Sequence, residues 1–577
     1  MLGFSGPPHE AASIAYFSME IGLESTIHTY SGGLGVLSGD TLRAAADLGI
    51  PMVGVTLVHR KGYFQQHLDS QGNQTESESP WFPDEFLSLL PVRVVVQLSS
   101  RPVQIQAWRY LLKGQSGHSI PVFLLDTMIP ENQPQDQALT DYLYGGDDRY
   151  RLSQEVVLGI GGVAMLRALG YHRVRAYHMN EGHSALASLA LIEEQTWGKA
   201  LNDANDDDRE SVRRRLIFTT HTPVSAGHDG FSMQLVRETL GSERADFLVA
   251  NNCCPENVLN MTRLALNFSG YINGVSMRHE EVSRTLFAEY SIESVTNGVH
   301  AGYWASPHIR ELYDRYVPEW RRDNHYLRYA ISIPTDDIWK THSEAKVDLL
   351  NEIERRSGVR LRPGVATVGL ARRATAYKRT GLLFQDIDRL KKIHQRVGPL
   401  QVVCAGKAHP RDDGGKDLIR RIHEAARALE GTIPVVYLEE YDIGLGKYLC
   451  SGVDLWLNTP QKPMEASGTS GMKAAINGVP SLSILDGWWI EGHIEGVTGW
   501  SIGDGWKTEG STTADAASLY DKLEYLILPM FYERPNAFAA IMRSCIALNG
   551  SYFNAQRMVV QYLQNAYLPA GSPKLEL

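Results

Sequence analysis

A lysine lies close behind a glycine- and hydroxyl-rich stretch near residue 470. The sequence there reads Glu465-Ala-Ser-Gly-Thr-Ser-Gly-Met-Lys473. A loop of this composition that opens a helix presents free backbone N–H groups, which suit a phosphate. An amine beside the loop can form a Schiff base with an aldehyde, provided that its pKa falls below the free value. A phosphate and an aldehyde together indicate pyridoxal 5′-phosphate (PLP) as the cofactor.

A basic cluster follows an apolar run at residues 366–370. It contains Arg372, Arg373, Lys378 and Arg379. The sequence predicts a helix over 379–393, and cations at the start of a helix oppose its macrodipole unless an anion lies there. Alone, such a cluster would be a solvated helix start. Together with the lysine motif it indicates a site for two neighbouring phosphates.

Two further stretches come directly after predicted strands in the first half of the chain. The run 31–40, SGGLGVLSGD, is either a tight turn or an anion-binding loop, and it lacks the dinucleotide pattern G-x-G-x-x-G. The run 178–183 contains two histidines and a glutamate but no H-E-x-x-H helix, so we expect no metal site there. The loop 221–228 is expected to line the same cleft.

These stretches together resemble segments of the glycogen and starch phosphorylases, in the same order from about residue 14 to residue 569. The match is specific around Lys473, because it fixes a glutamate, a Ser-Gly-Thr turn and the lysine together. The chain resembles a short, bacterial type of α-glucan phosphorylase. The resemblance implies a retaining phosphorolysis of glycogen, starch or maltodextrin to α-glucose 1-phosphate, with the 5′-phosphate of PLP as acid/base partner.

The resemblance also implies which residues hold the cofactor. Lys473 would form the Schiff base and Lys378 would lie at the cofactor phosphate, while Arg372 stands where the family has a lysine. The other residues expected at the cofactor are Gly32, Tyr441, Thr469 and Ser470.

On the substrate side, the resemblance places the N–H of Gly33 and the side chain of Arg373 at the reacting phosphate. The residues expected at the sugar are Asp148, His183, Glu465 and Ser467. Asp148 belongs to a shortened gate loop, 143–149, in which the family has a glucose-contacting asparagine.

Apolar runs that end in polar or glycine-rich loops alternate with segments of helical period. This alternation predicts parallel sheets covered by helices. The expected strands are 14–17, 52–58, 174–178 and 216–220, followed by 366–370, 402–405, 435–438, 455–458 and 481–485. The expected helices are 41–48, 339–356, 379–393, 416–429 and 472–477, with a helical tail from 520 onward.

A chain of 577 residues is too long for a single core. We expect an α/β protein with two Rossmann-like, doubly wound domains that face a central cleft, the GT-B-type glycosyltransferase fold. Ligands bind at the carboxyl ends of parallel strands, so the site is expected in this cleft. The first domain, 1–330, would hold the glucan side and the second, 331–550, the PLP and phosphate side. A C-terminal helix within 551–577 would pack back on the first domain.

Composition narrows the class of protein. The net charge of −10 argues against nucleic acid and against an anionic membrane surface as partners. The five cysteines show no C-x-x-C spacing, which indicates a reducing compartment, and the N-terminus has no export signal. We expect a cytoplasmic enzyme that acts on an α-1,4-glucan or maltodextrin and inorganic phosphate, with a homodimer as the candidate assembly.

Three alternatives remain open from the sequence. A sugar-nucleotide-dependent glucan synthase of the same fold would carry Glu-x7-Glu, whose second glutamate corresponds to Lys473 here. A PLP enzyme of amino acid metabolism would need an acidic partner for the pyridine nitrogen and exchange of the imine. A non-catalytic glucan-binding protein would bind oligosaccharide without releasing glucose 1-phosphate.

Overall fold

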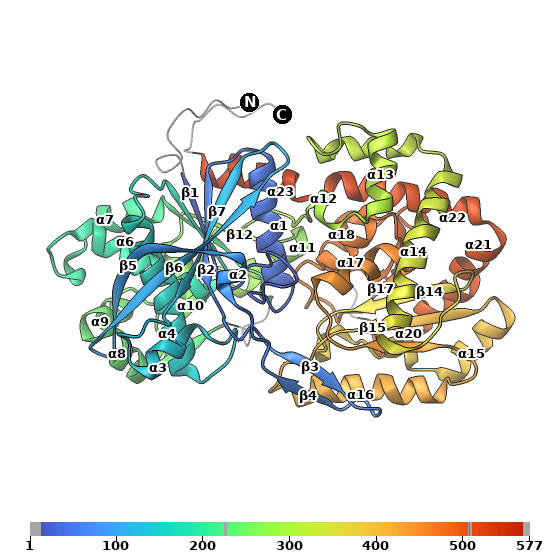
Figure 1. Ribbon diagram of the computed structural model, residues 1–577, viewed down its shortest axis with the longest axis horizontal. Coiled ribbons are helices and arrows are strands. Elements are labelled where there is room, and N and C mark those ends of the chain that lie inside the picture. Colours follow the sequence, from blue (N-terminus) through green and yellow to red (C-terminus); the bar gives the residue numbers. More distant parts are fainter. Residues whose placement is uncertain (1–12, 224–227, 506, 508–509, 569–577) are drawn as a thin grey trace.

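The computed structural model describes residues 13–223, 228–505, 507 and 510–568, and it contains two large sheets with helices on their faces (Figure 1). We call the larger sheet, within 14–294, and its helices the first lobe, and the sheet within 366–502 with its helices the second lobe. Figure 1 shows the two lobes side by side. The structure is therefore of the mixed α/β class that the sequence predicts.

The first lobe is built on a nine-stranded sheet in the order β13-β12-β9-β8-β1-β2-β7-β6-β5. Its middle strands are parallel, and β5 and β6 extend it with antiparallel pairs. All five residues of β1 are buried, as expected for a central parallel strand with both faces covered. The strands are β1 (Ile14–Ser18), β2 (Met52–Leu57), β5 (Ser88–Leu98), β6 (Arg101–Lys113), β7 (Ser119–Asp126), β8 (Ala176–Asn180), β9 (Leu216–Thr219), β12 (Tyr271–Gly274) and β13 (Glu293–Ser294).

The second lobe is built on six parallel strands in the order β16-β15-β14-β17-β18-β19. The order reverses between β14 and β17, and an open parallel sheet binds its ligands at such a reversal, outside the carboxyl ends of the strands. The strands are β14 (Ala366–Ala371), β15 (Leu400–Ala405), β16 (Val435–Leu438), β17 (Leu455–Asn458), β18 (Ser481–Ile484) and β19 (Gly499–Ile502).

Helices cover both sheets. Those of the first lobe include α1 (Gly33–Asp47), α4 (Asp148–Val156), α5 (Gly162–Ala168), α6 (Ala187–Thr196), α7 (Asp206–Arg213), α8 (Met233–Leu240), α9 (Ser242–Ala250), α10 (Met261–Phe268) and α11 (Met277–Leu286). The later ones include α12 (Ala301–Trp304), α13 (Pro307–Tyr316), α14 (Thr335–Ser357), α15 (Ile387–Arg396), α16 (Asp413–Ala428), α17 (Ile443–Gly452), α18 (Thr469–Ile476), α19 (Trp489–Gly492), α20 (Thr512–Lys522), α21 (Leu528–Glu533), α22 (Pro535–Ser544) and α23 (Ala555–Tyr562). No helix of the described residues combines the length and apolar character needed to cross a bilayer.

The predicted strands are confirmed to within a few residues, but two loop and helix predictions are wrong. The run 31–40 is mostly helix, because α1 begins at Gly33. The run 379–393 is not one helix: Arg379 has a left-handed φ of 47°, a 3-10 turn follows at Leu382–Phe384, and α15 begins only at Ile387. The basic cluster therefore does not lie at the start of an α-helix, and the macrodipole argument for it fails.

The C-terminal segment packs against the first lobe. Met558, Val559 and Tyr562 of α23 belong to the same buried cluster as residues of α1, β1 and β2. The Tyr567 hydroxyl is hydrogen-bonded to Nδ1 of His178 in β8 at 2.6 Å, and Val299 pairs with Asn554 in an isolated bridge. The expected domains also include residues 1–12 and 569–577, which lie outside the described residues.

A hairpin of the first lobe reaches across to the second. It consists of β3 (Gln65–Leu68) and β4 (Gln74–Ser77), and it lies beside α16 (Figure 1). The Gln66 and Gln74 amides donate to the carbonyls of Gly406 and Ala408, both at 2.9 Å. The Gln66 N–H also donates to the Glu440 carboxylate at 2.6 Å. We call this hairpin the clasp.

Candidate active site

Lys473 lies on the inner side of α18, close to the seam between the lobes. Gly468, with a left-handed φ of 92°, precedes the helix, and no side chain caps it. The Gly471 N–H donates to the Gly468 carbonyl at 3.2 Å, while the N–H groups of Thr469 and Ser470 have no intrahelical partner. The Lys473 amine is buried and lies 4.1 Å from the centre of the Trp304 ring. Burial lowers the pKa of this amine, which favours attack on an aldehyde.

Trp304 connects this amine to the first lobe. Its indole Nε1 donates to the carboxylate of Asp40, at 2.8 Å to Oδ2, and Asp40 lies fully buried on α1. The charge of Asp40 partly opposes the effect of burial on the Lys473 pKa. Neither residue could be recognised in the sequence, since a contact between positions 40 and 304 leaves no local pattern.

Arg372 follows β14 and is buried with spare donors. Its Nη2 donates to the Leu457 carbonyl at 2.9 Å, while Nε and Nη1 have no hydrogen-bond partner among the described residues. Burial lowers the pKa of Arg372 to about 10, and nearby Glu465 counteracts this. A buried guanidinium with unused donors fits a bound anion.

Together these observations test whether the residues suit PLP. The structure supplies a buried amine of lowered pKa, the uncapped first turn of α18 and a guanidinium with two unused donor atoms. Those are the partners that an aldehyde and a phosphate require. The residues therefore fit the group. No cluster of three or more metal-binding side chains occurs within the part of the chain that the structure describes.

Lys378 and Glu465, expected at phosphate and at sugar, form a partly buried ion pair with each other. The Glu465 backbone N–H donates to Asp486 at 2.9 Å. Burial raises the pKa of Asp486 to about 7, and the charge of Glu465 adds to this. The Ser467 hydroxyl lies nearby in sequence and is buried without a partner among the described residues. The pair neutralises two charges that a ligand would otherwise engage.

Three other residues expected at the cofactor have different surroundings. The Ser470 hydroxyl accepts a hydrogen bond from Trp456 Nε1 at 3.2 Å, and Thr469 is the first residue of α18. Tyr441 follows β16, and burial raises the pKa of its hydroxyl far above the ordinary range. Its hydroxyl lies against Gly446 of α17.

On the first lobe, Glu20 organises the loop before α1. One carboxylate oxygen accepts the N–H groups of Ser31 and Gly32 at 2.5 and 3.2 Å, and the other accepts the Tyr144 hydroxyl at 3.1 Å. The Gly32 N–H is therefore already used. The space beside Gly33 is open, because a Cβ added there would meet nothing within 4 Å. The first N–H groups of α1, beginning with that of Gly33, have no intrahelical partner.

Arg373 connects this loop to the second lobe. Burial alone would lower the pKa of Arg373, but Tyr377, Tyr63 and Glu20 raise it by their charge. Burial raises the pKa of Glu20, and Arg373 opposes this shift. The two side chains therefore stabilise each other's charge across the seam. Glu20 was not identified from the sequence, although it lies only two residues after β1.

His183 follows β8 and its ring lies 5.6 Å from that of Tyr144. Its Nε2 is 3.3 Å from Oδ2 of Asp229, and its Nδ1 is buried without a partner among the described residues. Burial lowers the pKa of His183, and the charges of Asp229 and Glu181 oppose this. Nδ1 thus has unused hydrogen-bonding capacity.

Asp229 in turn is held by Arg151, whose Nη2 donates to both carboxylate oxygens at 2.6 Å. Glu155, one turn further along α4, is fully buried, and burial followed by repulsion from Asp229 raises its pKa far above the ordinary range. By contrast, Asp148 is exposed at the first position of α4. Tyr144, not Asp148, is the gate-loop residue that contacts both Glu20 and His183.

A cavity of about 360 Å³ lies between the lobes. The first lobe contributes Tyr63 and the gate-loop residues from Tyr142 to Gly146, and the second contributes His409 to Arg411. The Tyr63 ring stands 6.4 Å from that of Tyr144 and 6.1 Å from that of His409. Aromatic faces of this kind suit the apolar faces of sugar rings.

The fold and the site thus define an α/β protein that places a buried amine and anion-binding groups at the carboxyl ends of its parallel strands. The family model for carbohydrate phosphorylases matches residues 215–520. A maltodextrin phosphorylase of Thermococcus litoralis is 36% identical over 96% of this chain and 70% of its own length. A glycogen phosphorylase of Aquifex aeolicus is 35% identical over 96% of this chain and 86% of its own length. An uncharacterized protein of Methanocaldococcus jannaschii is 31% identical and is covered over 99% of its length.

The chain belongs to the carbohydrate phosphorylase family. The resemblance found in the sequence is confirmed, and with it the assignment as a phosphorylase of the glycosyltransferase type.

Proposed function

We propose that this chain is a PLP-dependent α-1,4-glucan phosphorylase, which releases α-glucose 1-phosphate from maltodextrin or a storage glucan with retained configuration. The observation that carries the proposal is the buried Lys473 amine, next to the uncapped start of α18 and facing the other lobe through Trp304. The names of the relatives, maltodextrin and glycogen phosphorylase, support the substrate class. The two sheets support the GT-B-type arrangement as part of the same proposal.

Each group of residues has a task in this reaction. Lys473 would hold PLP, and Arg372 with the first turn of α18 would bind its phosphate. When bound, PLP supplies a phosphate with a pKa of about 6, which can exchange a proton near neutral pH. Arg373 and the N–H of Gly33 would hold the substrate phosphate, whose oxygen bonds to C1 of the terminal glucose while the bond from C1 to O4 breaks and O4 takes up a proton.

Charge explains why so many cations are needed. Two phosphates brought together in a dry cleft repel strongly unless cations lie beside them. Arg372 is buried, Lys378 is half-buried and Arg373 is exposed. Lys378 is paired with Glu465 in the structure, so we propose that it turns toward phosphate when Glu465 binds a sugar hydroxyl. His183, Glu465 and Ser467 would hold the glucose, and the cavity lined by Tyr63 and Tyr144 would admit the rest of the glucan.

A direct assay tests the proposal. The purified protein is incubated with PLP, maltoheptaose and inorganic phosphate, and glucose 1-phosphate is measured. We expect activity that survives reduction of the imine with borohydride, because the imine takes no part in the carbon chemistry. Activity toward an amino acid that borohydride abolishes would overturn the proposal.

The same preparation separates the remaining alternatives. A glucan synthase would transfer glucose from a sugar nucleotide and would not need PLP. A glucan-binding protein would hold maltoheptaose equally well after Lys473→Ala and would release no glucose 1-phosphate. We also propose a cytoplasmic location, which the five free cysteines support.

A further inference from the structure

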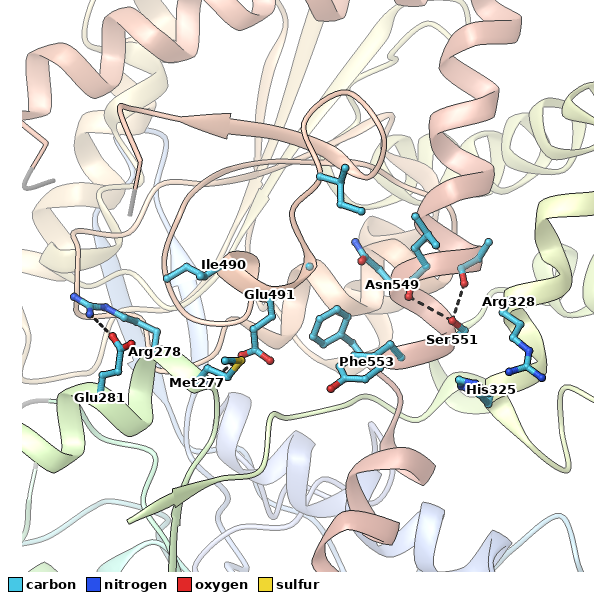
Figure 2. A pocket seen from close by; sticks show the side chains of 15 residues that line it. Met277, Arg278, Glu281, His325, Arg328, Ile490, Glu491, Asn549, Ser551 and Phe553 are labelled. Carbon is cyan, nitrogen blue, oxygen red and sulfur yellow. Dashed lines mark hydrogen bonds and ion pairs between the residues drawn. The ribbon is translucent and has the colours of Figure 1, made fainter. Parts of the chain in front are cut away.

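A second cavity, of about 660 Å³, opens where the first lobe meets the C-terminal helices (Figure 2). Its walls come from α11, from α19, from the 3-10 helix η7 (Asn324–Ser332) and from the π-helical segment η11 (Cys545–Gly550) with the residues that follow it. It shares no lining residue with the tyrosine-lined cavity. Its volume is that of a typical small-molecule site.

The inner surface of this cavity is mainly apolar. Phe553, Ile490 and Met277 line it in Figure 2, and Leu548 and Ile494 also contribute. Met277, Ile494 and Leu548 are 59%, 49% and 43% exposed. A contiguous group of exposed, large apolar side chains in a concave surface indicates a binding site.

One buried polar group in the wall lacks a partner. Asn549 is only 3% exposed and lines the cavity, and its Nδ2 has no hydrogen-bond partner among the described residues. Figure 2 shows Asn549 on the inner wall above Phe553. A buried amide donor without a partner costs about 1–3 kcal/mol, and a ligand with a hydrogen-bond acceptor would relieve this cost.

The charges at the rim decide which kind of ligand fits. Arg278 and Glu281 pair with each other at 2.7 Å, and Glu491 accepts the Met277 N–H at 2.9 Å and the Thr296 hydroxyl at 2.7 Å. Arg328 donates to the Tyr329 hydroxyl at 3.2 Å and forms no ion pair with a carboxylate within the described residues. The cavity therefore combines an apolar floor, a free amide donor and an uncompensated cation.

We propose that this cavity is a binding site for an amphiphilic organic anion. The flat or aliphatic body of the ligand would lie on Phe553 and Met277, its acceptor atoms would take the Asn549 Nδ2–H, and its negative charge would face Arg328. A neutral sugar chain fits less well, because most of the lining is apolar and the acidic groups at the rim are already engaged.

The position of the cavity connects it to the active site. Ser276, which precedes Met277, donates through its hydroxyl to the Ala466 carbonyl at 2.7 Å, and Ala466 is the neighbour of Glu465. The Glu491 carboxylate accepts the N–H of Met277, the first residue of α11, beside this contact. A ligand that moves α11 would therefore shift Glu465, so the site is an effector site. This coupling rests on the proposed function, whereas binding does not.

The binding test uses 8-anilinonaphthalene-1-sulfonate, a flat apolar body with one negative charge, as the probe. The fluorescence of the probe is measured during titration with the wild type, with Arg328→Glu at the exposed rim and with Asn549→Asp. The last variant keeps the shape of the side chain but replaces the amide donor by a carboxylate, which repels an anion. Arg173→Glu, an exposed charge reversal outside the cavity, is the matched control. We expect saturable binding that each cavity variant weakens about tenfold and the control leaves unchanged.

Binding that is absent, or that Arg328→Glu leaves unchanged, would overturn the proposal. Displacement of the probe by maltoheptaose would overturn the ligand class in favour of a glucan. In the phosphorolysis assay, saturating probe should change the wild-type rate by about fivefold and leave Arg328→Glu unaffected. An unchanged wild-type rate would refute the coupling. A protein without phosphorolysis that still binds the probe through Arg328 would refute the function and not the site.

Discussion

Asp229 lies between His183 and Arg151, and its replacement by asparagine tests how His183, proposed to hold the glucose, is positioned. In the structure Arg151 neutralises Asp229, while Glu155 lies four residues from Arg151 on the same face of α4. Burial and, next, repulsion from Asp229 raise the pKa of Glu155, which favours its protonated form. Asp229→Asn removes the repulsion, so we expect Glu155 to ionise and to become the partner of Arg151.

The magnitudes follow from these contacts. The single variant loses a long charge-assisted contact to His183, of 3.3 Å, which we put at about 1.5 kcal/mol or roughly tenfold in kcat/KM. Glu155→Gln alone should have a smaller effect, because both Glu155 carboxylate oxygens lack a hydrogen-bond partner among the described residues. The double variant leaves Arg151 buried without any carboxylate and should lower the free energy of unfolding by about 3–5 kcal/mol.

The assay is a double-mutant cycle that measures kcat/KM for phosphorolysis of maltoheptaose and the free energy of unfolding in urea. Glu238→Gln in α8 removes an exposed partner of Arg149, which lies on α4 like Arg151. This variant serves as the control, with an expected change below about 0.5 kcal/mol. If the two single effects on the free energy of unfolding sum to that of the double variant within about 0.5 kcal/mol, the exchange of partners is refuted.

Three other predictions concern cofactor, core and pH. Lys473→Ala should lose the absorbance of the imine and at least about 1,000-fold of the phosphorolysis rate; activity that survives without bound cofactor would contradict its role. Lys346→Met leaves buried Asp454 without its amine partner and should lower the free energy of urea unfolding by about 3 kcal/mol, whereas an unchanged midpoint would refute this. Burial lowers the pKa of His178 to about 3, so as the pH falls the unfolded chain takes up a proton on this histidine before the folded protein does. The free energy of unfolding should therefore fall by about 2 kcal/mol from pH 6.5 to 5. His178→Gln should reduce this loss, and an equal loss in both proteins would exclude His178 as its source.

Much of the parallel core could be predicted, because many of its strands carry a signal of their own in the sequence. The central strands are short apolar runs with both faces buried, as in β14 and β15, and a loop with glycine or charge follows each. The strands β7, β12 and β19, which form parallel pairs, were not predicted. The long antiparallel strands β5 and β6 were not predicted either, since exposed and half-buried residues dominate β5. Helix boundaries failed where a single backbone conformation decides them, as at Arg379.

The site could be predicted where its residues are close in sequence. Glu465, Ser467 and Lys473 stand within nine residues, so their types and spacing identify the chemistry. Trp304 was missed because its meaning depends on contacts with Asp40 and Lys473, each far away along the chain. Long-range pairs of this kind arise from the packing of one lobe on the other, and a single sequence does not display them.

The clasp constrains how the molecule can admit a polymer. Its glutamine amides donate to backbone carbonyls, which a side-chain substitution in the second lobe does not remove. These hydrogen bonds lie at the edge where Tyr63 approaches His409. A wide separation of the lobes at that edge would strip several buried hydrogen bonds at once. The lobes should therefore rotate relative to each other about the clasp. A glucan would then enter the cleft by its free end and not from the side.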